Sequence, residues 1–195
     1  MTSRLPAATR RQQLVEVATD TFGDTGFHAT SMNDVASAAG VTKPVLYQHF
    51  SSKEDLFEAV LRHVGSQLRS LLEAAASADG LTPRQQVERG FAAYFAFLRD
   101  HRASARVLFG EARRTDESTA AEADRAVESI ADFVATLIEI EGLDERARQV
   151  LANGIVGLAE GAGRFWARNQ HQMSADELAA LTAELAWSGL RGDHR

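Results

Sequence analysis

The sequence predicts an all-α protein, and three observations support this fold class. Apolar residues recur at three- and four-residue spacing, whereas β-branched runs with alternating polarity are absent from the sequence. Only three prolines occur in 195 residues, and two of them, Pro44 and Pro83, stand where helices are expected to begin. A composition of 45% hydrophobic and 25% charged residues is typical of a globular protein with a buried core.

Three helices and a longer fourth one are expected in the N-terminal third. Ser31 and Asp34 have the spacing of a capping box, which opens a short helix, and Gly40 is placed to end it. The fourth helix carries leucine, valine and phenylalanine residues along one face, as an amphipathic helix does. The expected ranges are 9–21, 31–40, 42–50 and 53–72.

Five further helices are expected in the remaining two thirds of the chain. Thr82 and Gln85 have capping-box spacing, and so do Ser174 and Glu177, while Asp144 is a predicted N-cap. The expected ranges are 83–100, 103–112, 118–141, 144–169 and 174–190.

Two of the expected short helices flank the segment Ala39–Thr42, which is the arrangement of a helix-turn-helix. Gly40 supplies the permissive backbone that a tight turn needs, and Thr42 is placed to cap the second helix. At about 100° per residue, Leu46 and Phe50 define the inward face of that helix.

The opposite face of the second short helix has side chains suited to the major groove of DNA. Gln48 can reach base edges, and Pro44 and Val45 can contact a thymine methyl group. Flanking and positively charged side chains are expected to bind phosphates, namely Lys43, Tyr47, His49 and Lys53.

The net charge of -6 argues against a nucleic-acid binder if the chain is taken as a whole. However, residues 1–53 carry five basic and four acidic side chains, a net of +1, so residues 54–195 carry -7. The acidity therefore lies mostly outside the segment expected to face DNA. We expect modest non-specific affinity for DNA and a steep salt dependence of specific binding.

A long ordered pattern covers about the first third of the chain. It comprises Phe22, Gly26, Phe27, Thr30–Met32, Ala39–Thr42, Leu46–Phe50 and Lys53–Leu56. At these residues the sequence resembles the TetR family of bacterial transcription factors. The resemblance implies a homodimer with one helix-turn-helix per subunit and a larger C-terminal domain that binds a small molecule. The residues that match the family's DNA interface are Met32, Thr42, Lys43, Pro44, Tyr47, His49 and Lys53.

The resemblance implies two functional regions. Residues 9–69 would form the DNA-binding domain with its connecting helix, and residues 70–195 the ligand-binding and dimerisation domain. Val45 and Gln48 occupy variable positions of the recognition helix, so the operator sequence does not follow from them. Some relatives bind DNA through an N-terminal arm, and here the basic residues are either such an arm or a solvated tail: Arg4, Arg10 and Arg11.

Glycines in the expected helix 144–169 indicate a close helix contact. Gly154, Gly157 and Gly161 project to one side, and each interior glycine costs about 1 kcal/mol of helix stability relative to alanine. Because the family pairs its last two long helices across a two-fold axis, we expect these glycines, with Leu181 and Leu185, to form the dimer surface. The alternatives are packing within one subunit and the widening of a pocket.

Aromatic residues concentrate in the C-terminal region and are expected either to line an apolar ligand cavity or to form an ordinary core. Polar candidates that would orient a ligand accompany them. The candidate set is Phe91, Tyr94, Phe95, Arg106, Phe109, Phe133, Glu160, Arg164, Phe165 and Trp166. A mostly apolar pocket favours a hydrophobic or amphipathic effector.

Enzymatic activity has little support in the sequence, which has no cysteine, phosphate-binding glycine loop or metal-ligand motif. We therefore expect no catalytic residues, no cofactor and no metal, and Glu139 and Glu141 are interpreted as solvated charges. No apolar run approaches the roughly 18 residues of a membrane span. The start of the chain does not resemble a secretory signal, so a cytoplasmic location is expected.

These observations predict a DNA-binding transcriptional regulator that binds double-stranded operator DNA as a homodimer. The form we expect is a repressor that a small-molecule effector releases from its operator. An activator of the same fold, or a regulator controlled by a protein partner, is one alternative. A helical scaffolding module without operator binding is another.

Overall fold

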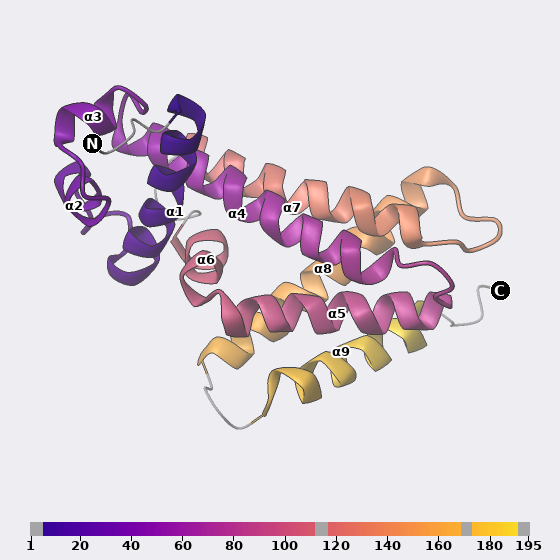
Figure 1. The fold of residues 1–195 in the computed structure, drawn as a ribbon. Helices are drawn as coiled ribbons and strands as arrows, with labels where there is room; N and C mark the ends of the chain where they lie inside the picture. The colour runs from indigo at the N-terminus through magenta and orange to yellow at the C-terminus, as the bar shows by residue number, and fades with distance from the viewer. Residues whose placement is uncertain (1–5, 112–116, 169–172, 191–195) are drawn as a thin grey trace. The chain divides into compact units, whose positions relative to one another are not determined.

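The computed structural model describes residues 6–111, 117–168 and 173–190, which contain helices and turns and no strand (Figure 1). The predicted all-α fold class is therefore confirmed. The elements are α1 (Ala7–Thr25), α2 (Met32–Ala38), α3 (Lys43–Tyr47), α4 (Lys53–Ala76), α5 (Pro83–Asp100), α6 (Arg102–Arg106), the π-helical turn η1 (Val107–Glu111), α7 (Glu117–Leu137), α8 (Glu145–Arg168) and α9 (Ala175–Leu190).

The chain forms two compact units. The N-terminal unit comprises the described residues of Met1–Gly65 and Arg102–Asp124, and the C-terminal unit those of Ser66–His101 and Arg125–Arg195. Helices α4 and α7 each contribute residues to both units. The sequence predicts one division of the chain between residues 69 and 70, whereas the described residues of 102–111 and 117–124 belong to the N-terminal unit.

Aromatic side chains form the centre of the N-terminal unit. The Phe57 ring of α4 lies 5.0 Å from the Phe22 ring of α1 and 4.8 Å from the Phe27 ring, measured between centroids. Phe22 and Phe57 are fully buried, and Phe27 is nearly so. These contacts fix α1 and the loop before α2 to the beginning of α4.

Helix α6 packs closely on α1 in the N-terminal unit. A Cβ built on Gly23 would lie 2.6 Å from the Cα of Ala103, so only glycine permits this crossing without a shift. The guanidinium of Arg106 donates to the Gly23 carbonyl oxygen at 2.5 Å and to the Asp24 carboxylate at 2.6 Å. Residues distant in sequence therefore complete the unit that contains α2 and α3.

The C-terminal unit is built around α5, which packs along α9, and α8 contacts both helices. The α5 side chains Phe91, Phe95 and Phe97 are buried. Arg84 of α5 forms an ion pair with Glu184 of α9, with 2.8 Å between nitrogen and oxygen. These contacts hold α5, α8 and α9 together in the C-terminal unit.

The predicted capping boxes are confirmed, whereas the ends of several predicted helices differ from the observed ones. Capping boxes form at the three expected sites, which are Ser31 with Asp34, Thr82 with Gln85, and Ser174 with Glu177. The expected helix 103–112 is divided into α6 and η1, and Ala112 lies outside the described residues. The expected helix 118–141 ends at Leu137, before a turn in which Gly142 has a φ of 84°.

Candidate DNA interface, effector site and dimer surface

The helix-turn-helix is shaped by local hydrogen bonds. The Asp34 amide donates to the Ser31 hydroxyl, and the Asp34 carboxylate accepts from the Ser31 amide at 2.8 Å. Hydrogen bonds from the Ser31 side chain and backbone lower the pKa of Asp34 below its ordinary value. At the turn, Gly40 has a φ of 64°, and the Val41 amide donates to the Ala36 carbonyl at 2.9 Å. The predicted capping box and the predicted glycine turn are both confirmed.

Helix α3 has one buried and one exposed face. Leu46 is fully buried and Phe50 is 1% exposed, which confirms the predicted inward face. Pro44 and Gln48 are exposed, and Val45 is half-buried. The predicted recognition helix therefore presents its predicted outward face, with Val45 set closer to the core than expected.

Polar groups of three kinds lie along the exposed side of α3. Tyr47 is 45% exposed, and the Lys43 ammonium lies 5.8 Å from the centroid of its ring. His49 is half-buried and lies two residues after the end of the helix. Thr42 is the N-cap residue, but its side chain makes no capping hydrogen bond and stays exposed. A phenol, an ammonium and a hydroxyl are therefore available at one face.

Met32 differs from the other predicted DNA-interface residues because its side chain is only 6% exposed. It begins α2, where Val35 and Ala36 are also buried. The structure places its thioether in the core of the helix-turn-helix, so the side chain contributes packing instead of an accessible contact.

Lys53 also differs from an open surface cation. Its ammonium donates to the carbonyl oxygens of Phe27 at 2.9 Å and Thr30 at 3.1 Å. It lies 4.2 Å from the centroid of the Phe27 ring, within the range of a cation–π interaction. The expected phosphate contact stays a prediction for this residue.

The N-terminal arginines have separate positions. Arg4 lies outside the described residues. Arg10 donates to the Gln13 side-chain oxygen at 2.8 Å, whereas the Arg11 guanidinium lies 4.6 Å from the centroid of the Phe50 ring. Sequence reasoning missed this link between Arg11 and the end of the recognition helix, because no local spacing connects residues so far apart in the chain.

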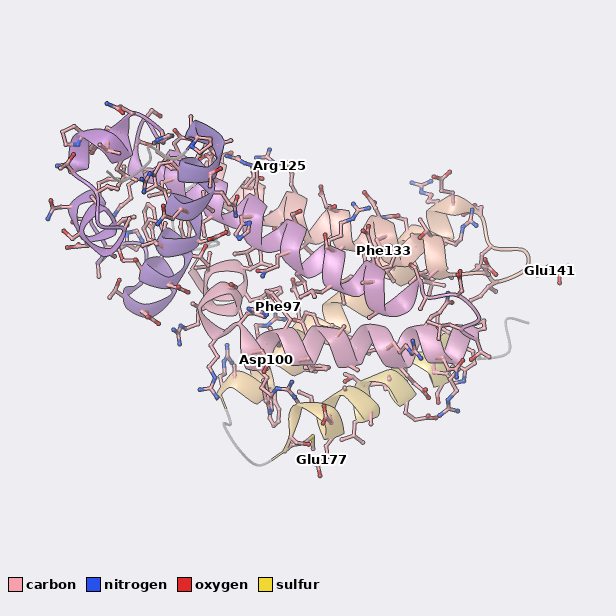
Figure 2. The ribbon with its side chains drawn as sticks, viewed as in Figure 1. Phe97, Asp100, Arg125, Phe133, Glu141 and Glu177 are labelled. Atoms are coloured by element: carbon pink, nitrogen blue, oxygen red, sulfur yellow. The ribbon has the colours of Figure 1, made fainter. Side chains whose placement is uncertain are left out.

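Several of the predicted effector residues lie in the core of the C-terminal unit. Phe91 and Phe95 on α5 and Phe133 on α7 are each less than one tenth exposed. The Trp166 indole donates to the Met173 carbonyl at 2.9 Å and so links α8 to the start of α9. Glu139 and Glu141 are exposed as expected, and Figure 2 shows Glu141 in the loop that follows α7.

A buried polar cluster joins α5 to α8. Glu160 is 8% exposed, and one of its oxygens accepts from Arg164 at 3.1 Å. Its other oxygen, Oε1, is buried without a hydrogen-bond partner among the described residues. Burial, and then the charge of Glu160, raise the pKa of the Tyr94 phenol well above its ordinary value. An unpaired buried carboxylate oxygen is costly, and a bound donor group would remove that cost.

Three predicted effector residues lie elsewhere. Arg106 belongs to the N-terminal unit, where its guanidinium is bonded to α1. Phe109 belongs to η1 of the same unit. Phe165 is 65% exposed on α8. The helical spacing of these residues indicated neither the unit nor the face to which they belong.

The glycines of α8 lie on an open surface. A Cβ built on Gly154, Gly157 or Gly161 would meet nothing within 4 Å. Val150 and Phe165, which are 68% and 65% exposed, continue the same stripe at helical spacing. Leu181 and Leu185 on α9 are 59% and 61% exposed. We call these seven residues the α8–α9 stripe. Val150 and Phe165 were not in the predicted dimer surface, although each lies four residues from the nearest glycine of the stripe.

The two short helices, the glycine turn between them and the exposed face of the second helix define a helix-turn-helix DNA-binding regulator. The chain belongs to the TetR family. A family model described as bacterial regulatory proteins, tetR family, matches residues 14–60. A second one, described as tetracyclin repressor-like, C-terminal domain, matches residues 83–189. The predicted resemblance and the predicted function as a DNA-binding transcriptional regulator are therefore confirmed.

Relatives of the chain include regulators named for opposite effects. The HTH-type transcriptional activator FasR of Mycolicibacterium smegmatis is 35% identical over 190 residues, 96% of this chain and 86% of the relative. The HTH-type transcriptional repressor KstR2 of the same organism is 32% identical over 114 residues, 56% of this chain and 53% of the relative.

Solved structures share the fold over nearly the whole chain. A TetR-like transcriptional regulator from Rhodococcus sp. RHA1 has a TM-score of 0.77 at 33% identity, over 97% of this chain and 100% of that chain. FadR from Bacillus subtilis, solved in complex with stearoyl-CoA, has a TM-score of 0.80 at 19% identity, over 91% of this chain and 98% of that chain.

The described residues also bear on membrane spans and metal sites. Among the described residues, no helix is long and apolar enough to cross a membrane. Within the same parts of the chain, histidine, aspartate and glutamate side chains do not gather into a group of three that could hold a metal ion.

Proposed function

We propose that this regulator binds its operator as a homodimer and that a small-molecule effector releases it. The observation that supports DNA binding is that α3 has a buried face and an exposed face. Leu46 is fully buried, whereas Gln48 is exposed. In this proposal Gln48, Pro44 and Val45 face base edges, while phosphate contacts come from Thr42, Lys43, Tyr47 and His49. The helix-turn-helix region 9–69 carries DNA binding, and residues 70–195 carry effector binding and dimerisation.

The α8–α9 stripe supports the dimer. Glycines in the middle of α8 let the backbone of a second helix approach, and Val150, Phe165, Leu181 and Leu185 supply apolar surface around them. A closed two-fold dimer would bury the same stripe from both subunits. It would also present two recognition helices to half-sites about one DNA turn apart.

Chain connectivity supports the coupling of effector and DNA. Helix α4 begins directly after the helix-turn-helix and continues past Gly65 into the C-terminal unit. An effector that binds only one arrangement of the C-terminal unit would shift the position of α4, and the two recognition helices would no longer match their half-sites. A ligand that binds tightly and leaves operator affinity unchanged would contradict this coupling.

The effector that we propose is amphipathic. Its apolar part would pack against aromatic side chains of α5 and α7, such as Phe91 and Phe133. Its polar part would donate a hydrogen bond to Glu160 Oε1, which lacks a partner among the described residues. Stearoyl-CoA, the ligand in the FadR structure, is the amphipathic probe that we would test first. Titration calorimetry of the wild-type protein and the Glu160→Ala variant would measure its binding.

The sign of regulation depends on where the operator lies. Release from an operator that overlaps a promoter increases transcription, whereas release from an upstream site that recruits polymerase decreases it. FasR, which is matched over 86% of its length, is named an activator, and that observation favours the activator alternative. A promoter–reporter fusion measured with and without the gene for this protein would decide between the two.

DNA binding is tested with fragments that the purified protein selects from genomic DNA. We expect the double variant Tyr47→Phe and His49→Ala to lose about tenfold or more in affinity for every sequence, because phosphate contacts carry no sequence information. His101→Ala in the C-terminal unit is the matched control and should bind DNA like the wild type. A wild-type protein that selects no DNA would contradict the proposal and favour the scaffolding alternative.

A further inference from the structure

The ammonium group of Lys53 is held inside the N-terminal unit. It donates to the carbonyl oxygens of Phe27 at 2.9 Å and Thr30 at 3.1 Å, and it lies 4.2 Å from the centroid of the Phe27 ring. An ammonium has three donors, so two of them are directed at the protein's own backbone. The side chain is half-buried at the first turn of α4.

The two acceptors of Lys53 occupy a particular place in the chain. Thr30 directly precedes the N-cap residue of α2, and Phe27 lies three residues before Thr30, whereas Lys53 begins α4 after the segment that follows α3. The complete helix-turn-helix therefore lies between the ammonium and the carbonyls that it binds. These hydrogen bonds close the motif as a non-covalent ring.

We propose that Lys53 is a positioning residue that closes the helix-turn-helix and thereby holds α2 and α3 in their DNA-binding arrangement, in place of the phosphate contact that the sequence predicts. This inference rests on the proposed DNA-binding function. Lys53 acts through the loop of residues 27–30, and α3 makes the contacts with DNA.

The loop that Lys53 binds is itself fixed, which makes it an effective anchor. The Thr30 hydroxyl donates to the Gly26 carbonyl at 2.7 Å and lies 2.6 Å from the Thr25 hydroxyl oxygen. The Phe27 ring packs against the ring of Phe57, itself in α4. Because the loop is fixed, its hydrogen bonds to Lys53 also fix the beginning of α4. A mobile loop would not do so.

Lys43 provides a comparison within the same motif. Its ammonium is exposed at the start of α3 and lies 5.8 Å from the centroid of the Tyr47 ring. It is therefore positioned to meet a phosphate, and loss of its charge should act on DNA binding alone. Lys43→Met and Lys53→Met remove the same group from the two positions and keep the aliphatic stem.

The experiment measures two properties of the full-length dimer. The first is operator affinity over a range of salt concentrations, which counts phosphate contacts through the slope of log affinity against log salt. The second is amide hydrogen exchange over residues 31–52 in the absence of DNA. For Lys53→Met we expect about tenfold weaker binding at every salt concentration, an unchanged slope and faster exchange. For Lys43→Met we expect a slope smaller by about one and unchanged exchange.

A smaller slope with unchanged exchange in Lys53→Met would make Lys53 a phosphate contact and overturn the proposal. Unchanged affinity and exchange would overturn it as well. If the wild-type protein selected no DNA, the proposed function would fail, but the exchange comparison would still test the closure of the motif.

The wild-type protein offers a test that no folding defect can obscure. In nuclear magnetic resonance spectra, the Lys53 ammonium protons should be shielded by the Phe27 ring and should keep that shift when operator DNA is added. A through-hydrogen-bond coupling between the Lys53 nitrogen and a DNA phosphorus would contradict the proposal. Lys43 is expected to show such a coupling.

Discussion

Glycines serve opposite purposes in the two units. Gly23 of α1 lies under α6, and a Cβ there would come within 2.6 Å of Ala103 backbone. On α8, Gly154, Gly157 and Gly161 lie in open space. A helix of the same chain already covers the first glycine, whereas nothing in the described chain covers the other three.

The difference shows how a single chain can indicate its assembly. A glycine in a helix lowers helix stability by about 1 kcal/mol relative to alanine, so a stripe of them is kept only where close packing compensates. Packing compensates for Gly23 within the N-terminal unit. For the glycines of α8 we propose that the compensation comes from the second subunit of the proposed dimer.

The sharpest test of this comparison replaces Gly157 with leucine. The monomer has room for the side chain, so its thermal unfolding should change little, but a partner helix could no longer approach. We expect loss of the dimer and at least a hundredfold loss of operator affinity, since a single half-site forms fewer contacts. Sedimentation velocity and a binding titration measure the two effects.

Gly90→Leu on α5 is the matched control for that experiment, because a Cβ on Gly90 also meets nothing within 4 Å. It should leave both the dimer and operator affinity intact. A Gly157→Leu protein that still sediments as a wild-type dimer would refute the placement of the interface.

A second test concerns the covered glycine. Gly23→Ala should lower the free energy of unfolding by about 1–3 kcal/mol despite the better helix propensity of alanine, because the colliding atoms include Ala103 backbone. Chemical denaturation measures the change. The double variant with Ala103→Gly should recover part of the loss, and a Gly23→Ala protein as stable as the wild type would show that the two helices separate easily.

The smallest effect is expected at Gly163. A Cβ there would lie 2.8 Å from a methyl carbon of Leu98, which is the far end of a flexible side chain. Gly163→Ala should therefore change the free energy of unfolding by no more than about 1 kcal/mol, because the gain in helix propensity offsets a small movement of Leu98. A much larger loss in the same denaturation experiment would mean that Leu98 is held rigidly.

Local signals in the sequence predicted most of the fold. The capping box of Ser31 and Asp34, the turn at Gly40 and the burial of Leu46 and Phe50 all depend on residues within one or two helical turns of each other. Short spacings determine such features directly, so one sequence is enough to find them.

Contacts between distant segments account for what the sequence did not predict. Lys53 was expected to bind phosphate because it is a cation next to the motif, and its acceptors lie 23 and 26 residues away. Arg106 was expected near the effector and is bonded to α1, 83 residues earlier. The sequence identifies each of these side chains as a cation, but the tertiary structure determines which acceptor the cation binds.

The return of residues 102–111 and 117–124 to the N-terminal unit affects how such regulators can be recombined. A hybrid made by joining two relatives at one junction near residue 65 would place α6 of one parent against α1 of the other. The close approach of Gly23 to Ala103 and the bond from Arg106 to Asp24 would then combine residues that had not been selected together. Operator specificity should therefore transfer between relatives only when the N-terminal segment and the segment that contains α6 are exchanged together. Sequence changes in one of these segments should accompany changes in the other.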